Sequence, residues 1–264
     1  MDAIILAGGV IPEELRESLD TTARQSANDE RALLPVNGRP AISWILDSLR
    51  DVSAIDRVSV VGEKQTLELL PQWMPEAIGL SAQNTLSANV LAGLDAARSE
   101  SVLVMTCDIP LVTSQTWEAF LAQSGARGLE AAYPIVRSEQ MESTFPGGKR
   151  TYATVMDGRF TGGNAFLLPK SCRGQLEKVL ETAYNARKNP LKLAALLGPG
   201  FILKATFRRL SIADAERKIS QILHCQAGAI EMNDATIAFD MDKASDYHTI
   251  QSTFVKRGKI GERD

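Results

Sequence analysis

The sequence lacks the features that mark several common classes of protein. Its three cysteines, Cys107, Cys172 and Cys225, form no CxxC pair, which argues against a zinc cage or a disulfide framework and predicts a reduced, cytoplasmic setting. Its two histidines, His224 and His248, fall in predicted helices with no matching acid or cysteine partner. We therefore expect packing roles for both histidines and no hydrolase triad.

Strong positive charge and long apolar runs are also missing. The net charge of -3 and the pI near 5.6 give no basic face for a nucleic acid, so we predict no nucleic-acid partner. Residues 193–203 are too few to cross a bilayer, and residues 77–94 are too polar. The opening MDAIILAGG has no basic n-region, which predicts no secretory signal.

What is present is an alternation of short apolar runs with helical periodicity. The 264 residues suffice for one domain, 1–264, with a single large core. The predicted strands cover 3–7, 58–61, 102–105, 131–136, 164–168 and 237–239, and the predicted helices 40–50, 87–98, 114–123 and 171–186, one capped by Ser211 and a last one capped by Ser245. A hairpin turning at Asp157-Gly158 lies between them. This order predicts an α/β fold, a Rossmann-like, mixed, mainly parallel sheet flanked by helices.

One stretch differs in character from the rest. Residues 190–210 are apolar and basic and are broken by Gly198-Pro199-Gly200, within a predicted small helical insertion or subdomain at 187–225. Three interpretations remain open for 190–210: a subdomain over a bound substrate, a homodimer contact, or a peripheral contact with an anionic membrane.

The first predicted strand stops at Gly8-Gly9. Backbone amides at the carboxyl end of such a strand lie where ligands of open α/β sheets bind, and glycine allows a phosphate to approach closely. The dinucleotide pattern GxGxxG and the Walker A pattern are both absent. From this turn alone, a plain tight turn and an anion-binding turn are equally good interpretations.

The turn gains specificity from the residues after it. Leu6-Ala7-Gly8-Gly9 is followed by a variable loop and then by Arg31-Ala32-Leu33-Leu34-Pro35-Val36-Asn37-Gly38-Arg39-Pro40. This combination resembles the signature of the nucleotidyltransferase (NTP transferase) superfamily, which includes molybdopterin-guanylyltransferase-like and sugar-phosphate nucleotidyltransferase-like enzymes. The resemblance implies the nucleotide-diphospho-sugar transferase type of fold, with a first loop that wraps the triphosphate.

The same resemblance implies roles for individual residues. Arg31 matches the basic residue that neutralises the triphosphate, although the family usually has lysine there and a GxGxR run where this chain has Pro12-Glu13-Glu14. The predicted nucleotide-binding residues are Leu6, Ala7, Gly8 and Gly9, with Asn84, Ser87 and Asn89 from a second segment. A capped helix with solvated asparagines is the other interpretation of that second segment.

Aspartates appear at two places that the resemblance links to a metal. Asp108 follows the buried run 102–105, and the family's Asp-x-Pro at this point binds magnesium. Asp240 and Asp242 resemble the family's carboxyl-terminal D-x-D motif, while a simpler interpretation makes Asp242 and Asp246 caps of the last helix. We predict that Asp108, Asp240 and Asp242 hold Mg²⁺ and that Asp108 and Arg31 are catalytic.

We expect two glycine-containing segments to bind the acceptor, the second substrate of the transfer. Lys149 and Arg150 group two cations before the hairpin, where they could bind an acceptor phosphate. Gly163 and Asn164 follow the hairpin and resemble a family segment that lines the acceptor.

The predicted function is Mg²⁺-dependent transfer of a nucleoside monophosphate from a nucleoside triphosphate, CTP or GTP, with release of pyrophosphate. The acceptor is expected to be phosphorylated or an alcohol, and small or lipid-linked. Two alternatives stay open: a nucleotide-sugar-dependent glycosyltransferase, and a catalytically silent nucleotide-binding regulator.

Overall fold

The protein is built around one mixed sheet of nine strands. The computed structural model describes residues 1–19, 21–186, 198–207 and 209–261. The sheet order is β5 (Ile78–Ser81), β4 (Arg57–Gly62), β1 (Asp2–Ala7), β6 (Ser101–Thr106), β10 (Ala165–Pro169), β7 (Ala131–Arg137), β9 (Gly158–Gly162) and β8 (Ala153–Val155), with β11 (Ala227–Glu231) paired to β7. The first four strands in this order are parallel, and β10 runs antiparallel to both β6 and β7.

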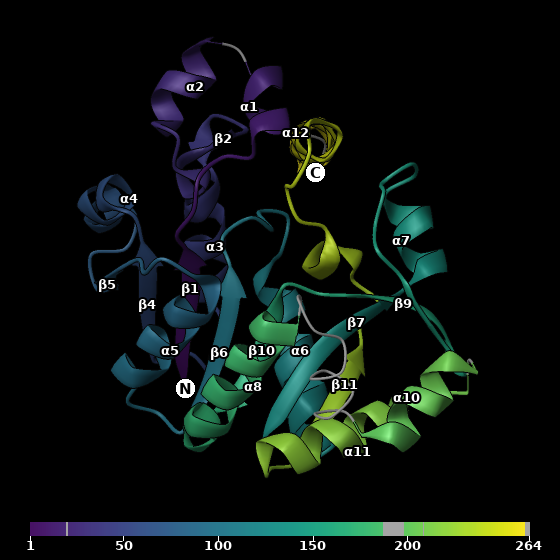
Figure 1. Ribbon diagram of the computed structural model, residues 1–264. Helices are drawn as coiled ribbons and strands as arrows, with labels where there is room; N and C mark the ends of the chain where they lie inside the picture. Colours follow the sequence, from purple (N-terminus) through teal and green to yellow (C-terminus); the bar gives the residue numbers. More distant parts are fainter. Residues whose placement is uncertain (20, 187–197, 208, 262–264) are drawn as a thin grey trace.

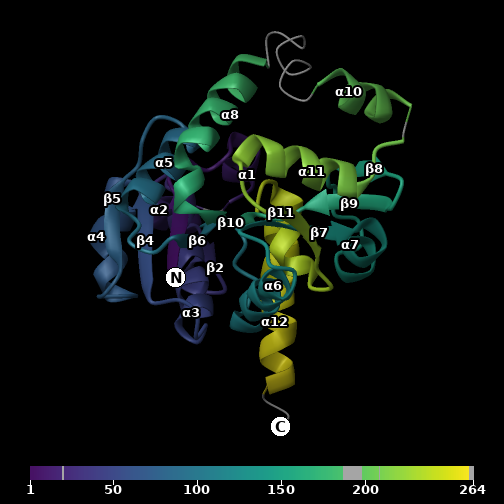
Figure 2. The ribbon, with the colours of Figure 1, turned by 90° about the horizontal axis from the view of Figure 1, so that it is seen from below.

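Helices cover both faces of this sheet (Figures 1 and 2). One face carries α3 (Ala41–Arg50), α6 (Ser114–Ala126) and α12 (Ala244–Gly261), and the other α5 (Leu86–Ala96), α8 (Arg173–Ala186) and α11 (Ile212–Leu223). Each face has its own cluster of buried apolar side chains. The remaining elements are α1 (Glu13–Ser18), α2 (Thr21–Ala27), β2 (Pro35–Val36), β3 (Arg39–Pro40), α4 (Lys64–Leu69), α7 (Ser138–Thr144), α10 (Pro199–Thr206) and 3-10 turns at Arg31–Leu33, Leu70–Gln72, Lys170–Cys172 and Ala235–Ala238.

The apolar patterns explain the central elements and confirm the predicted fold class. All six residues of β1 are buried, as expected for a parallel strand covered on both sides. In α3 the periodic residues Ile42, Ile45, Leu46 and Leu49 are all buried, so the helix packs through the predicted face. The capping box predicted at Ser211 is present, because its side chain accepts a hydrogen bond from the Asp214 amide.

Several local predictions were wrong. Residues 237–239 are not a strand; the side chain of Asp234 caps a buried 3-10 turn, Ala235–Ala238, and the last strand of the sheet is β11. The hairpin turns at Met156-Asp157, since Val155 pairs with Gly158. Ser245 lies within α12, which begins one residue earlier at Ala244.

The predicted insertion at 187–225 is described only in part. Residues 187–197 and 208 lie outside the described residues, and the rest of the segment forms α10 and α11. Two contacts tie the start of α11 to the hairpin: the Met156 amide donates to the Leu210 carbonyl, and the Ile212 amide donates to the Asp157 carboxylate. Among the described residues, no helix combines the length and the apolar character needed to cross a membrane.

A glycine sets how closely α5 packs on β1. A Cβ atom on Gly93 would lie 2.6 Å from Cγ2 of Ile4, which is fully buried. We expect Gly93→Ala to lower the free energy of unfolding by about 1–3 kcal/mol, because the helix must shift away from the sheet. Gly125→Ala in α6 is the control: nothing lies within 4 Å of its Cβ position, so the change should be neutral or stabilise by up to about 1 kcal/mol. Urea denaturation of both variants measures this, and equal stabilities would contradict the packing account.

Candidate functional site

The glycine turn lies at the carboxyl end of β1, as predicted. Gly9 has a φ of +117°, which favours glycine, and its amide donates to Glu63 Oε1 over 3.3 Å. Glu63 was not predicted, and its carboxylate accepts from a backbone amide that the resemblance assigns to the triphosphate. The side chains of Leu6 and Ala7 are buried, so these two residues can offer only backbone groups to a nucleotide.

The loop after Gly9 is longer than the family pattern and is held in place by a buried acid. Glu30 accepts hydrogen bonds from the amides of Gln65 and Thr66 and from the Thr66 hydroxyl, at the start of α4. These bonds satisfy free amides at the amino end of that helix. The loop therefore returns to the edge of the sheet and places Arg31 next to Asp108.

The second predicted nucleotide segment lies beside the glycine turn. Asn89 is buried, and its side-chain oxygen accepts from the Gln83 amide over 2.5 Å. A Cβ on Gly8 would lie 3.0 Å from the Asn89 side-chain nitrogen and 2.9 Å from the Ala82 Cβ, so a larger residue there would have to displace a neighbour. Asn84 is exposed and Ser87 is half-buried at the start of α5. The structure thus brings the two predicted segments together at one edge of the sheet.

Three predicted metal ligands meet at the same edge. Asp108, Asp240 and Asp242 each present an oxygen, and these oxygens lie within 4.8 Å of one another. The two chain segments are joined through their backbones, because the Met241 amide donates to the Asp108 carbonyl over 3.0 Å. Three closely spaced carboxylates are the donor set that a hard cation such as Mg²⁺ prefers.

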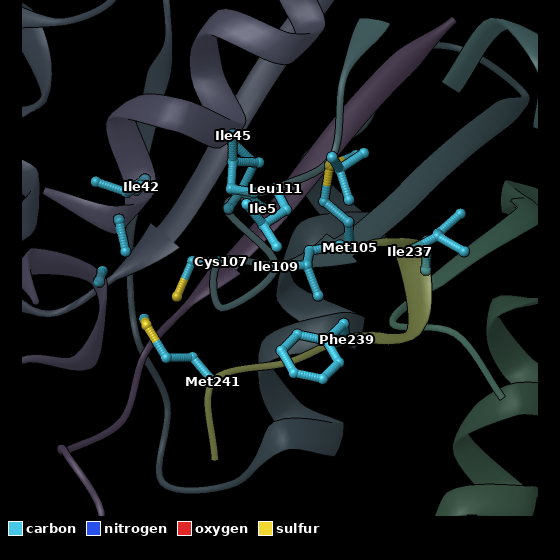
Figure 3. Packing of buried hydrophobic residues seen from close by; sticks show 14 of the residues in the cluster. Ile5, Ile42, Ile45, Met105, Cys107, Ile109, Leu111, Ile237, Phe239 and Met241 are labelled. Carbon is cyan, nitrogen blue, oxygen red and sulfur yellow. The ribbon is translucent and has the colours of Figure 1, made fainter. Parts of the chain in front are cut away.

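Apolar neighbours fix these aspartates in position. Cys107 and Ile109 flank Asp108, and Phe239 and Met241 flank Asp240, and all four neighbours are buried in one cluster (Figure 3). Burial also raises the pKa of the Cys107 thiol to about 12, with the nearby Asp108 charge acting in the same direction. Cys107 is therefore a neutral core residue.

Arg31 lies inside the aspartate cluster. Its Nη2 is 2.8 Å from Asp108 Oδ2, contacts Asp242 Oδ1, and donates to the Met241 carbonyl over 2.9 Å. Burial opposes the charge of Arg31, but Asp108 and Asp242 outweigh burial and raise its pKa. Its Nε is buried with no hydrogen-bond partner among the described residues.

The pKa values of Asp240 and Asp242 shift in opposite directions in this cluster of charges. Burial and the neighbouring Asp108 charge raise the pKa of Asp240 to about 7, despite the attraction of Arg150. Burial also acts against ionisation of Asp242, but hydrogen bonds with Asp240 and Arg31 outweigh it and lower the pKa of Asp242. At neutral pH the pair therefore shares a proton, which a divalent cation would displace.

The predicted acceptor residues line a cavity of about 460 Å³ beside the aspartates. Its walls are Tyr133, Lys149, Arg150, Thr151, Thr161, Gly162, Gly163, Asn164, Ala238, Asp240, Asp242 and Lys243. All four predicted acceptor residues are in this set, while Tyr133, Lys243 and the two threonines were not predicted. Lys149 is exposed and is a suitable cation for a ligand phosphate.

Arg150 is engaged within the protein. Its Nη1 lies 3.3 Å from both Asp240 Oδ1 and Asp246 Oδ2, and its Nη2 donates to the Asp240 carbonyl over 2.8 Å. The guanidinium carbon also lies 4.3 Å from the centre of the Phe239 ring. These contacts hold the segment that carries Asp240, which is a positioning role that the sequence did not indicate.

A mixed sheet that brings a glycine turn and three aspartates to one edge places the protein among α/β nucleotide transferases. Residues 3–192 match the model of the MobA-like NTP transferase domain. The chain belongs to this family, as its sequence signature predicted.

Individual relatives agree with this assignment. The chain is 32% identical over 100 residues to a molybdenum cofactor guanylyltransferase of Ectopseudomonas mendocina (strain ymp), covering 37% of this chain and 48% of that protein. It is also 28% identical over 90 residues to a 2-C-methyl-D-erythritol 4-phosphate cytidylyltransferase of Prochlorococcus marinus (strain MIT 9313). This match covers 33% of this chain and 40% of that protein. The chain thus spans less than half the length of these curated relatives.

A solved structure matches along almost the whole chain. A hypothetical transferase from Thermus thermophilus is 33% identical, with a TM-score of 0.76, and the match covers 93% of this chain and 98% of that one. The similarity therefore includes the carboxyl-terminal segment with Asp240 and Asp242, beyond the residues of the family match.

The raised pKa of Asp240 predicts how metal binding depends on pH. Below about pH 7 the carboxyl holds a proton that a cation must displace, so the affinity for Mn²⁺ should rise about tenfold from pH 6 to pH 8. Asp240→Asn should weaken binding and flatten this dependence. Calorimetric titration at several pH values measures both effects, with Asp95→Asn on α5 as the control. An equally steep pH dependence in Asp240→Asn would show that another group is responsible.

Proposed function

We propose that the protein is a Mg²⁺-dependent nucleotidyltransferase that transfers a nucleoside monophosphate from CTP or GTP to a phosphorylated or alcohol acceptor, releasing pyrophosphate. The observation that carries this proposal is the meeting of Asp108, Asp240 and Asp242, two of which line the same cavity as Lys149 and Asn164. The guanylyl- and cytidylyltransferase relatives support the class of reaction and the two nucleotides.

The residues present fit a divalent cation. Three carboxylates offer oxygen ligands, and the partly satisfied Arg31 is the only residue of the first loop that contacts them in the described hydrogen bonds and ion pairs. When bound, Mg²⁺ would neutralise charge on the phosphate oxygens. The three aspartates would hold it.

The remaining steps follow from the placement of the chain's own groups. The amides of Gly8 and Gly9 would bind the β- and γ-phosphates once Glu63 gives up the Gly9 amide. Arg31 would turn from Asp108 and Asp242 to the same phosphates. An acceptor oxygen held near Lys149 and Asn164 would attack the α-phosphorus, and the bond to the β-phosphate would break as pyrophosphate leaves.

A catalytically silent nucleotide-binding regulator is the second candidate. It is favoured by the internal contacts that Arg31 and the Gly9 amide already make, because each must break before a triphosphate can bind. A silent regulator would bind a nucleotide and release no pyrophosphate. The lipid-linked acceptor, the homodimer and the membrane contact of 190–210 remain predictions, since residues 190–197 lie outside the described residues.

The proposal is tested with Asp108→Asn. In the native protein, Mg²⁺ with CTP or GTP should raise the Tm by about 5 °C or more, and pyrophosphate should appear when sugar, polyol or aryl phosphates are added. Asp108→Asn keeps the Thr106 hydroxyl as a neighbour, at 2.5 Å, so it should fold while turnover falls at least about a thousandfold.

Asp95→Asn is the matched control, because Asp95 is exposed on α5 and pairs with Arg173 away from the cluster. It should retain both the thermal shift and the turnover. Unchanged turnover in Asp108→Asn would refute the assigned role, and nucleotide binding without pyrophosphate release in the native protein would favour the regulator.

A further inference from the structure

Two stacked aromatic side chains lie beside the cavity, and one of them is exposed. Tyr133 on β7 and Phe166 on β10 stack with ring centres 4.8 Å apart and an interplanar angle of 17°. We call this pair the aromatic step. Tyr133 lines the cavity, so the step begins inside the proposed acceptor site.

The exposure of Phe166 is unusual for its position. β10 lies between β6 and β7 in the interior of the sheet, yet the Phe166 side chain is 45% exposed. Leu168, two residues further on the same face, is 7% exposed and packs in the cluster beneath α5 and α8. The helix cover therefore ends between Leu168 and Phe166 and leaves an aromatic ring uncovered beside the cavity, where a ligand could bury it.

The position of Tyr133 depends on a neighbouring glycine. A Cβ atom on Gly162 would lie 1.9 Å from the Tyr133 hydroxyl oxygen, so any other residue in this β9 position would displace the ring. Gly162 itself lines the cavity. The missing side chain at Gly162 thus leaves room on β9 for the Tyr133 hydroxyl beside the cavity.

The lining of the cavity combines charged side chains with one aromatic ring. Lys149, Lys243, Asp240 and Asp242 are its charged members and suit a phosphate and a cation. The Tyr133 ring belongs to the same lining, and its stacking partner Phe166 lies next to it, outside the lining residues. A ligand that contacts both the charged residues and the aromatic step must itself carry a charged group and an apolar group.

We infer that the acceptor is a phosphate ester whose phosphate is attached directly to an apolar group, and that this group packs on Phe166. The inference rests on the proposed function, because the aspartate cluster and Lys149 are the groups that would receive the phosphate of the acceptor. Phe166 and Tyr133 are then specificity residues that select an apolar body over an open polyol chain. Burying about 60 Å² of apolar surface on the step corresponds to roughly a tenfold gain in affinity.

The test compares three probes in the presence of Mg²⁺ and a non-hydrolysable analogue of CTP or GTP: glycerol 3-phosphate, 1-naphthyl phosphate and geranyl phosphate. Calorimetry should show that the two apolar esters bind about tenfold more tightly than glycerol 3-phosphate. Preference for the naphthyl ester would indicate a flat group, and preference for the geranyl ester a chain. Phe166→Ser should remove the preference and leave glycerol 3-phosphate unchanged, while Phe166→Tyr should retain it.

Val255→Ser is the control, because Val255 is an apolar residue 51% exposed on α12 and outside the cavity lining. It should leave all three affinities unchanged. Equal affinities in the native protein, no binding of any ester, or an equal loss for all three in Phe166→Ser would overturn the inference. If the nucleotide analogue binds while the esters show no preference, the inference fails and the proposed function stands; if the analogue with Mg²⁺ does not bind, the proposed function fails.

Discussion

The ion pairs of Arg31 with Asp108 and Asp242 are the interaction on which the arrangement of the site depends. Three carboxylates within 4.8 Å of one another repel strongly when they are partly buried, and such a cluster persists only when compensating charge lies among them. Arg31 supplies that charge on the side of the first loop, and Arg150 supplies it on the side of Asp240 and Asp246. These two arginines offset the repulsion among the closely spaced aspartates.

The same interaction joins three remote parts of the chain. Arg31 lies at the end of a loop that Glu30 anchors to α4 through hydrogen bonds. Asp108 follows β6, and Asp242 follows a segment in which Phe239 and Met241 are buried. Because the neighbours of each charged residue are packed in one apolar cluster, the positions of the charges are set by the core. Stability of the core and geometry of the site are therefore coupled, while Asp242 and Lys149 remain exposed enough to meet a ligand.

The sequence predicted the parts of the protein that depend on local pattern or on the family signature. Buried runs identified β1 and β6, helical periodicity identified α3, and the signature residues Gly8, Asp108 and Asp240 do meet at one edge. It missed β11, because the short segment 227–231 contains small residues and gains its strand structure only by pairing with β7. The positioning role of Arg150, the occupation of the Gly9 amide by Glu63, and the stacking of Phe166 on Tyr133 depend on tertiary contacts that no sequence spacing specifies.

The account claims that Arg31 and a divalent cation use the same carboxylate oxygens. A titration of the nucleotide-free protein with Mn²⁺, followed by electron paramagnetic resonance, tests this directly in the native protein and in Arg31→Met, with Arg39→Met as the control. The account predicts one Mn²⁺ site that binds roughly tenfold or more tightly when the Arg31 charge is removed, and no change in the control. Equal or weaker binding in Arg31→Met would contradict it.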